Sequence, residues 1–134
     1  MKASSDQAAA STSVNIAIVR GQLSTEVNVS ALPAGGTVHN FEVKTGTGRE
    51  RFVVPVAWHD PTRPPRLRVG DDVVVIGAVR RRWFRAGGGS QSRTEVVARV
   101  VGKAGSRRAA TAIEAVVAEL AGRDGSEGRK GIHQ

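Results

Sequence analysis

The sequence predicts a small all-β barrel of five strands, with a flexible N-terminal arm, a short C-terminal helix and a tail. Short runs of alternating apolar and polar residues, separated by Gly and Pro, recur from residue 14 to residue 102. Such runs are typical of strands joined by turns. Residues 109–121 differ, because their apolar side chains recur at helical spacing. The 134-residue chain is long enough for one domain with a modest core.

The charge of the chain favours a polyanionic partner. Lys and Arg number 20 against 12 Asp and Glu, which gives a net charge of +8, and only four of the basic residues are Lys. Arg suits planar contacts with phosphates and stacking on bases, which favours nucleic acid. A bias toward Arg and Ala in the source genome would give the same composition and is the alternative explanation.

The sequence lacks the residue combinations and spacings that most catalytic and metal sites require. The chain has no Cys, which removes disulfides, thiolate nucleophiles and the usual structural zinc sites. The three His residues (39, 59 and 133) lie far apart, with no carboxylate at metal-ligand spacing. The Gly run at residues 87–89 lacks the Lys and helix that follow in a phosphate-binding loop. We therefore expect a binding protein without metal or cofactor, not an enzyme.

The first part of the chain predicts an arm followed by three strands. Residues 1–13 contain few apolar side chains, so we expect a flexible arm. Alternation on both sides of Gly21 predicts a long bent strand that stops at a turn near residues 32–36. The strands predicted next are residues 37–44, with Phe41 in the core, and residues 49–59, joined by a short turn.

Aromatic residues of the predicted strand at 49–59 are candidate base-stacking residues. By the period of two, four residues share one face: Phe52, Val54, Val56 and Trp58. Core packing is the alternative for both aromatic residues, since two Val residues share their face. Pro55 cannot donate to a ladder, which predicts a bulge or a strand edge there. Residues 60–69 contain three Pro and predict a stiff loop, not a helix.

The segment from Gly70 to Phe84 is the centre of the prediction. Its β-branched residues 73–76 indicate a buried strand, and Gly77 indicates a bulge or a close backbone approach. Three Arg and two aromatic residues follow: Arg80, Arg81, Arg82, Trp83 and Phe84. This mixture suits single-stranded nucleic acid, with charge for phosphates and rings for unstacked bases. The alternative is a solvated strand end. Adjacent rings on a regular strand point to opposite faces, so Trp83 and Phe84 cannot share one surface unless a bulge intervenes.

The remaining chain predicts a hairpin tip, a last strand and a C-terminal extension. The Gly-rich tip spans residues 86–92 and the last strand residues 93–101. A short amphipathic helix is expected at residues 109–121, ended by Gly122, with a disordered tail beyond it. The predicted organisation is an arm at 1–13, a barrel domain at 14–103 and the extension at 104–134.

The chain resembles bacterial single-stranded DNA-binding proteins over about residues 14–102. The opening motif is matched by eight residues: Asn15, Gly21, Leu23, Pro33, Gly35, Val38, Asn40 and Phe41. The later motifs are matched by Val56, Ala57, Trp58, Gly70, Val73, Gly77, Arg80, Arg82, Phe84, Thr94, Glu95, Val96 and Val97.

The resemblance implies a five-stranded OB fold that assembles as a homotetramer. It implies sequence-independent binding and protection of single-stranded DNA in replication, recombination or repair, with bases stacked on Phe52, Trp58 and Phe84. Trp83 matches no aromatic residue of the family. The predicted DNA-binding residues are Arg49, Arg51, Phe52, Trp58, Arg80, Arg82, Trp83, Phe84 and Arg93. Alternatives are a protein-interaction or RNA-binding OB domain.

Three departures from the family point to a specialised member. The hairpin between Lys44 and Phe52 is shorter than usual and lacks the aromatic residue often found in it, and a Pro-rich loop replaces the family's helix. The tail is basic instead of acidic, so recruitment of repair enzymes through an acidic tip is not expected. No apolar run approaches the roughly 20 residues of a membrane span. The first thirteen residues also lack the apolar core of a secretory signal. We expect a cytoplasmic protein without membrane contact.

Overall fold

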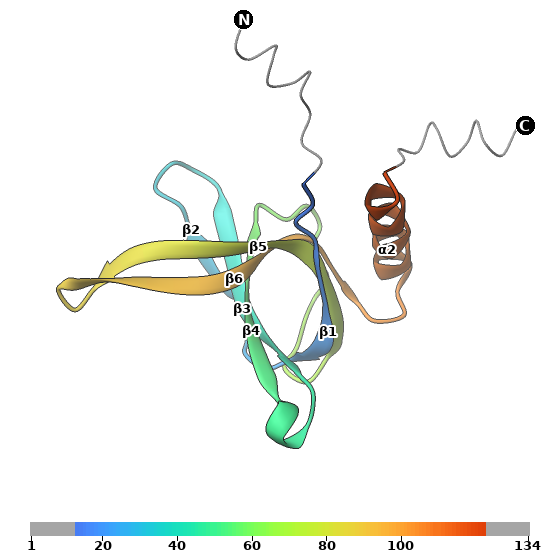
Figure 1. Cartoon of the computed structure of the whole chain (residues 1–134), viewed down its shortest axis with the longest axis horizontal. Helices are drawn as coiled ribbons and strands as arrows, with labels where there is room; N and C mark the ends of the chain where they lie inside the picture. The colour runs from blue at the N-terminus through green and yellow to red at the C-terminus, as the bar shows by residue number, and fades with distance from the viewer. Residues whose placement is uncertain (1–12, 123–134) are drawn as a thin grey trace, which may run out of the picture.

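The computed structural model describes residues 13–122 and consists mostly of β-strands, with one α-helix near its C-terminal end (Figure 1). The elements are β1 (Ala17–Leu23), β2 (Asn28–Ala31), β3 (Thr37–Thr45), the 3-10 turn η1 (Gly48–Glu50), β4 (Phe52–His59), β5 (Asp72–Ala86), β6 (Gly89–Lys103) and α2 (Arg107–Leu120). The all-β prediction with a short C-terminal helix is confirmed at this level. The predicted arm, except Ser13, and the predicted tail beyond Gly122 lie outside the described residues.

Five strands form a closed ring, which surrounds the centre of the view in Figure 1. Around the ring β1 pairs with β5, β5 with β6, β6 with β4, β4 with β3, and β3 with the end of β1. The pairing of β4 with β6 is parallel and the others are antiparallel. β2 pairs with the same edge of β3 that receives the end of β1.

The predicted long bent strand is divided into β1 and β2. Between them the backbone N–H of Ser24 donates to the carbonyl of Glu42 at 2.9 Å. The hydroxyl of Thr25 accepts from the N–H of Glu42, also at 2.9 Å. A side-chain oxygen therefore takes the place of a backbone acceptor, and the edge of β3 stays satisfied across the break.

The main core fills the inside of the ring. Alternate residues of the strands point inward and are almost fully buried, Phe41 among them as predicted. The buried cluster consists of Leu23, Phe41, Val43, Val56, Trp58, Val73, Val75, Val96, Ala98 and Val101. Their burial is the main source of the ring's stability, because apolar area removed from water contributes about 25 cal/mol per Å².

Helix α2 covers the outer face of β5 and β6 with a second apolar cluster. Ala109, Ala112 and Val116 pack on Val74 and Ile76, which point away from the ring. The helix begins two residues earlier than predicted, because the hydroxyl of Ser106 caps it by accepting from the N–H of Ala109 at 3.1 Å. Its end agrees with the prediction of a terminating Gly122, which takes a φ of 74°.

The two longest strands, β5 and β6, form a hairpin whose outer part projects well beyond the ring (Figure 1). The predicted tip at residues 86–92 and strand at 93–101 are wrong, because Ala86 pairs with Gly89 across a two-residue turn. Gly87 and Gly88 have φ of 58° and 78°. Positive φ at both central residues is what a tight hairpin of this type requires, so both strands continue to the turn.

Gly77 marks the place where β5 leaves the ring. The register of β5 with β6 shifts between Ile76 and Gly77. A Cβ atom at Gly77 would collide with the carbonyl oxygen of Val97. The predicted bulge and the predicted close backbone approach are therefore both confirmed.

The predicted strand at 49–59 is shorter than expected. β4 begins at Phe52, because Gly48–Glu50 forms the turn η1, and Arg49 and Arg51 precede the strand. Pro55 pairs with Glu42 of β3, while β6 pairs with β4 only from Val56 onward. Pro55 thus lies where β4 has a free edge, as predicted. Residues 60–69 form a loop without a helix, also as predicted.

Candidate nucleic-acid interface

The candidate site is built on the part of the β5–β6 hairpin that lies outside the ring. β1 pairs with β5 only up to Gly77, and β4 pairs with β6 only from Val96 onward. Between those points and the turn, β5 and β6 pair with each other, and no other strand of residues 13–122 pairs with either outer edge. The hairpin is therefore a two-stranded ribbon with two accessible faces.

Strand alternation divides the side chains of this ribbon between two faces. The groove face carries Arg80, Arg82, Phe84, Gln91, Arg93 and Glu95. The tryptophan face carries Val79, Arg81, Trp83, Arg85, Ser90, Ser92 and Thr94. Trp83 pairs with Ser92 and Phe84 with Gln91 in unbroken register, so the two rings lie on opposite faces, as the sequence predicts.

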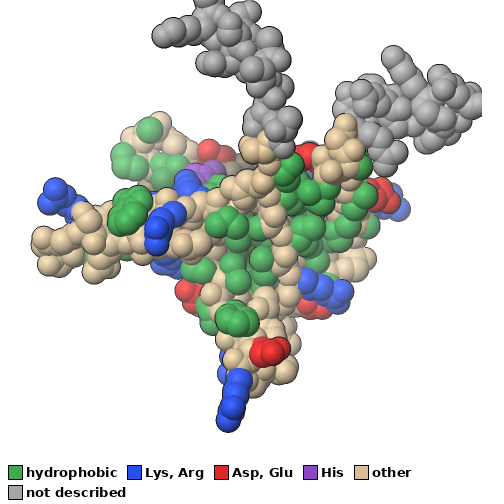
Figure 2. Space-filling model, viewed as in Figure 1, with side chains coloured by type: hydrophobic (Ala, Val, Ile, Leu, Met, Phe, Trp, Pro, Cys, Tyr) green, Lys and Arg blue, Asp and Glu red, His purple; other side chains and the backbone are tan. Residues whose placement is uncertain are grey.

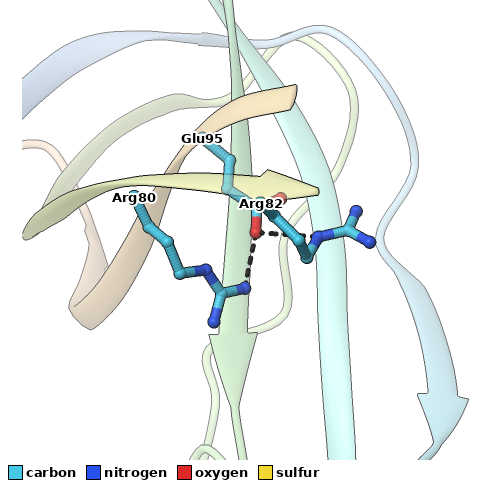
Figure 3. Close-up of polar contacts among 3 residues, drawn as sticks. All are labelled: Arg80, Arg82 and Glu95. Carbon is cyan, nitrogen blue, oxygen red and sulfur yellow. Dashed lines mark hydrogen bonds and ion pairs between the residues drawn. The ribbon is translucent and has the colours of Figure 1, made fainter. Parts of the chain in front are cut away.

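A buried carboxylate anchors the groove face. Glu95 is 4% exposed, and its Oε2 lies 2.5 Å from a terminal nitrogen of Arg80 and 3.3 Å from Nε of Arg82. Figure 3 shows both guanidinium groups approaching the same carboxylate oxygen. The two Arg side chains remain 42% and 46% exposed, so their outer nitrogens stay accessible. Glu95 fixes the position of two cations and neutralises only one of their charges.

The groove face of the ribbon adjoins the outer side of β3 and β4. Arg93 lies 3.5 Å from the carboxylate of Glu42 on β3. A hollow of about 210 Å³ separates the ribbon from these strands. It is lined by Leu32, Val38, Asn40, Ala57, His59, Arg80, Arg82 and Glu95. A chain lying along this surface would have arginines on one side and strand residues on the other.

Each face of the ribbon has one aromatic ring with an arginine over it. On the groove face, Cζ of Arg82 lies 5.3 Å from the centroid of the Phe84 ring. On the tryptophan face, Cζ of Arg81 lies 5.2 Å from the ring of Trp83, whose side chain is 64% exposed. Hydrophobic and basic side chains accordingly lie next to each other along the hairpin in Figure 2. A cation over one side of a ring orients the ring and leaves its other side for stacking.

Trp58 does not belong to this surface. It is 6% exposed and lies in the core cluster inside the ring, with its ring edge-to-face against His39 at 6.2 Å between centroids. The predicted stacking role is corrected on this ground, because a base can stack only on a ring face that solvent reaches. The alternative of core packing is the one observed.

The other predicted residues lie on two separate projections of the ring. Arg80, Arg82, Trp83, Phe84 and Arg93 are on the β5–β6 hairpin. Arg49 and Arg51 lie on the exposed connection from β3 to β4, and Phe52, 64% exposed, begins β4. The β3–β4 connection projects from the ring in a different direction from the hairpin (Figure 1). The predicted set is therefore not one compact cluster.

Two residues of the site, Glu95 and Asn15, match the family motifs but were given no role in binding from the sequence. Glu95 could be placed against Arg80 only by knowing the hairpin register. Asn15 fixes the base of the ribbon, since its side-chain amide donates to the carbonyl of Val79 and accepts from the N–H of Val79, both at 2.9 Å. Asn15 is part of the family motif, but its partner lies 64 residues away.

Neither a protein-family model nor a curated protein matches the chain. Among residues 13–122, no group of three or more His, Cys, Asp or Glu side chains could hold a metal ion. No helix within these described residues is long and apolar enough to cross a membrane. Function is accordingly inferred from the ribbon and its surroundings.

Proposed function

We propose that the chain is an OB-fold protein that binds single-stranded DNA with little sequence preference. The observation that carries the proposal is the groove face, where Arg82 lies over the ring of Phe84 and is itself positioned by the buried Glu95. The ring of Phe84 is half-buried; the part that solvent reaches can stack on any base, and arginines contact phosphates. Binding of this kind protects single strands during replication, recombination or repair.

The strand order supports the OB fold. Taking β1 and β2 as one interrupted strand, the ring has the order 1-2-3-5-4-1, with β5 and β6 as strands four and five. OB folds bind oligonucleotides on the face of strands two and three and on the loop between strands four and five. In this chain those parts are β3 with β4 and the β5–β6 ribbon, which border the hollow on the groove face.

The chemistry of the ribbon favours a single strand over a duplex. A ring can stack on a base only when the base is free of its own neighbours, which a duplex does not allow without unpairing. Within the described residues, no helix lies on the groove face where it could enter a major groove, since α2 packs on the ring end of β5 and β6. Phosphate contacts alone would hold a duplex weakly.

Competition between nucleic acids tests this proposal. A labelled oligothymidine is bound to the protein at moderate salt, and its fluorescence anisotropy is followed while unlabelled competitors are added. We expect an unlabelled single strand of mixed sequence to displace it at much lower concentration than a duplex of equal length. Equal competition by the duplex contradicts the proposal. Tighter binding of an RNA strand of the same sequence would favour the RNA-binding alternative.

A protein contact is the second candidate function, favoured by a separate surface. Ile18 on β1 and three residues of α2, Ile113, Val117 and Leu120, are exposed although apolar. Exposed apolar patches on soluble domains commonly mark contacts with other proteins. We propose that copies of the chain associate, as the family resemblance implies for a homotetramer. Light scattering after size-exclusion chromatography measures the mass, and a monomer at micromolar concentration contradicts association.

A further inference from the structure

The tryptophan face of the ribbon has no assigned role in the proposed function. Its large apolar side chains, Val79 and Trp83, are exposed rather than packed. Trp83 is 64% exposed, and an indole is a large apolar surface to leave in water. Because Trp83 lies on the side opposite to Phe84, the groove face cannot account for it.

We propose that the tryptophan face is a second contact for the same single strand, with the indole of Trp83 stacking on a base. This inference rests on the proposed function and extends it to the other side of the ribbon. The strand would then contact both faces of the hairpin, Phe84 on one and Trp83 on the other. Trp83 would act as a binding residue in its own right.

Charge identifies nucleic acid as the occupant of this face. The side chains that β5 and β6 place there include Arg81 and Arg85 and no carboxylate. Within the described residues, none of the ion pairs involves either of these two arginines. On the groove face, by contrast, Arg80 and Arg82 share Glu95. The tryptophan face therefore offers phosphates two cations that are in no ion pair among these residues, one of which, Arg81, lies over the Trp83 ring.

The cross-strand neighbours suit the same ligand. Ser92 lies opposite Trp83, Thr94 opposite Arg81 and Ser90 opposite Arg85. All three hydroxyl residues are exposed. Hydroxyl groups donate hydrogen bonds to phosphate oxygens and contribute position without sequence preference. An aromatic ring among arginines and hydroxyls is the combination expected for a flexible polyanion with flat bases.

The ribbon is thin enough for one strand to reach both faces. It is a single layer of two strands, and no other strand in the described part of the chain pairs with β5 beyond Gly77 or with β6 before Val96. Sheets that pack face to face lie about 10 Å apart, so a single sheet layer together with its side chains is only about that thick. The turn at Gly87 and Gly88 adds no bulky side chain at the tip. A single strand can pass over an edge or the tip from Phe84 to Trp83.

Tryptophan fluorescence reports on this contact directly. The chain has two Trp residues, and Trp58 is buried in the ring. The difference between the emission of the parent and that of Trp83→Phe therefore isolates Trp83. We expect saturating oligothymidine to quench this difference signal, because a stacked base quenches an indole. Binding itself is followed separately by the anisotropy of a labelled oligonucleotide.

Affinity measured against strand length provides the second readout. Trp83→Ala is expected to bind the shortest binding oligothymidine like the parent, because that oligonucleotide occupies the groove face. For longer strands it should bind roughly 5- to 150-fold more weakly than the parent, the loss typical of one stacked base. Val69→Ala removes an apolar side chain that is 56% exposed on the loop before β5, outside both proposed surfaces, and is the control. We expect it to bind strands of every length as the parent does.

The outcomes separate this inference from the proposed function. If labelled strands bind but Trp83 emission and the affinity of Trp83→Ala for long strands stay unchanged, the second contact is wrong and the groove face stands. If no strand binds, both fail. If Trp83 emission in the DNA-free protein shifts to the blue with rising protein concentration and DNA does not quench it, the face is a contact between copies of the chain. That result also overturns the inference.

Discussion

The guanidinium of Arg80 lies 2.5 Å from the carboxylate of Glu95, which is almost completely buried and also receives Arg82 at 3.3 Å. One acidic residue thus holds two of the cations assigned to phosphates. A phosphate that binds either arginine has to compete with Glu95 for it. In the proposed function, the carboxylate would therefore weaken phosphate binding and at the same time fix the position of the two side chains.

Glu95→Gln is expected to bind single-stranded DNA more tightly at low salt than the parent. The amide keeps the shape of the side chain but removes one negative charge, so more of the positive charge of Arg80 and Arg82 is available to phosphates. Loss of the charged hydrogen bonds should reduce the free energy of unfolding by about 1–3 kcal/mol. Anisotropy titrations at several salt concentrations and thermal melting measure the two effects. Glu119→Gln breaks an exposed pair with Arg99 on α2 and should change neither.

Arg82→Ala and Phe84→Ala should respond differently to salt. Each phosphate neutralised on a single strand contributes roughly 0.7 to the slope of log affinity against log salt, so Arg82→Ala lowers the slope together with the affinity. Phe84→Ala removes a ring worth on the order of 1–3 kcal/mol per stacked base and leaves the slope nearly unchanged. Arg107→Ala, an exposed arginine on α2, is the charge control. If the slope of log affinity against log salt is the same for Arg82→Ala and the parent, Arg82 does not contact a phosphate.

Trp58→Ala and Phe52→Ala should differ in stability. Removing a buried Trp from the ring costs about 3–5 kcal/mol of the free energy of unfolding and should lower Tm by more than about 10 °C. Phe52 is 64% exposed at the start of β4, so Phe52→Ala should leave Tm within a few degrees of the parent. Differential scanning calorimetry gives both values. A Trp58→Ala protein that melts like the parent would contradict the buried placement of this ring.

Patterns of period two predicted most strands and the opposite faces of Trp83 and Phe84, because alternation is a local property of the chain. The same pattern could not decide the role of Trp58. β4 begins outside the ring and continues into it without a change in its side-chain alternation. Phe52 and Trp58 therefore point to the same face of β4, but Phe52 is exposed and Trp58 is buried. Burial there depends on how far the ring extends along β4, which is a tertiary property.

The residue types of the candidate interface could be predicted from the sequence, but the contacts between particular side chains could not. The contact of Arg80 with Glu95 requires the register of the hairpin, which depends on a two-residue turn at Gly87 and Gly88 and on the shift near Gly77. Three consecutive Gly residues do not show which two make the turn.

The early start of α2 has a local cause, the capping hydroxyl of Ser106, which the helical spacing of apolar residues does not reveal.

Gly77 and Gly89 lie on the same hairpin and should differ in their tolerance of a methyl group. A Cβ atom at Gly77 would collide with the backbone carbonyl of Val97, whereas none of the atoms of residues 13–122 lies within 4 Å of a Cβ at Gly89. Backbone cannot move aside as a flexible side chain does, so Gly77→Ala has to shift β6 or change the register next to Ile76.

We expect Gly77→Ala to lower the free energy of unfolding by about 1–3 kcal/mol, the usual cost of overpacking. Gly89→Ala should stay within about 0.5 kcal/mol of the parent. Denaturant titrations followed by circular dichroism measure both. Because Gly77 sets the exit of the ribbon from the ring, Gly77→Ala should also bind single strands more weakly than Gly89→Ala under conditions where both are folded. Equal stability of the two variants would mean that the close approach at Gly77 does not constrain the hairpin.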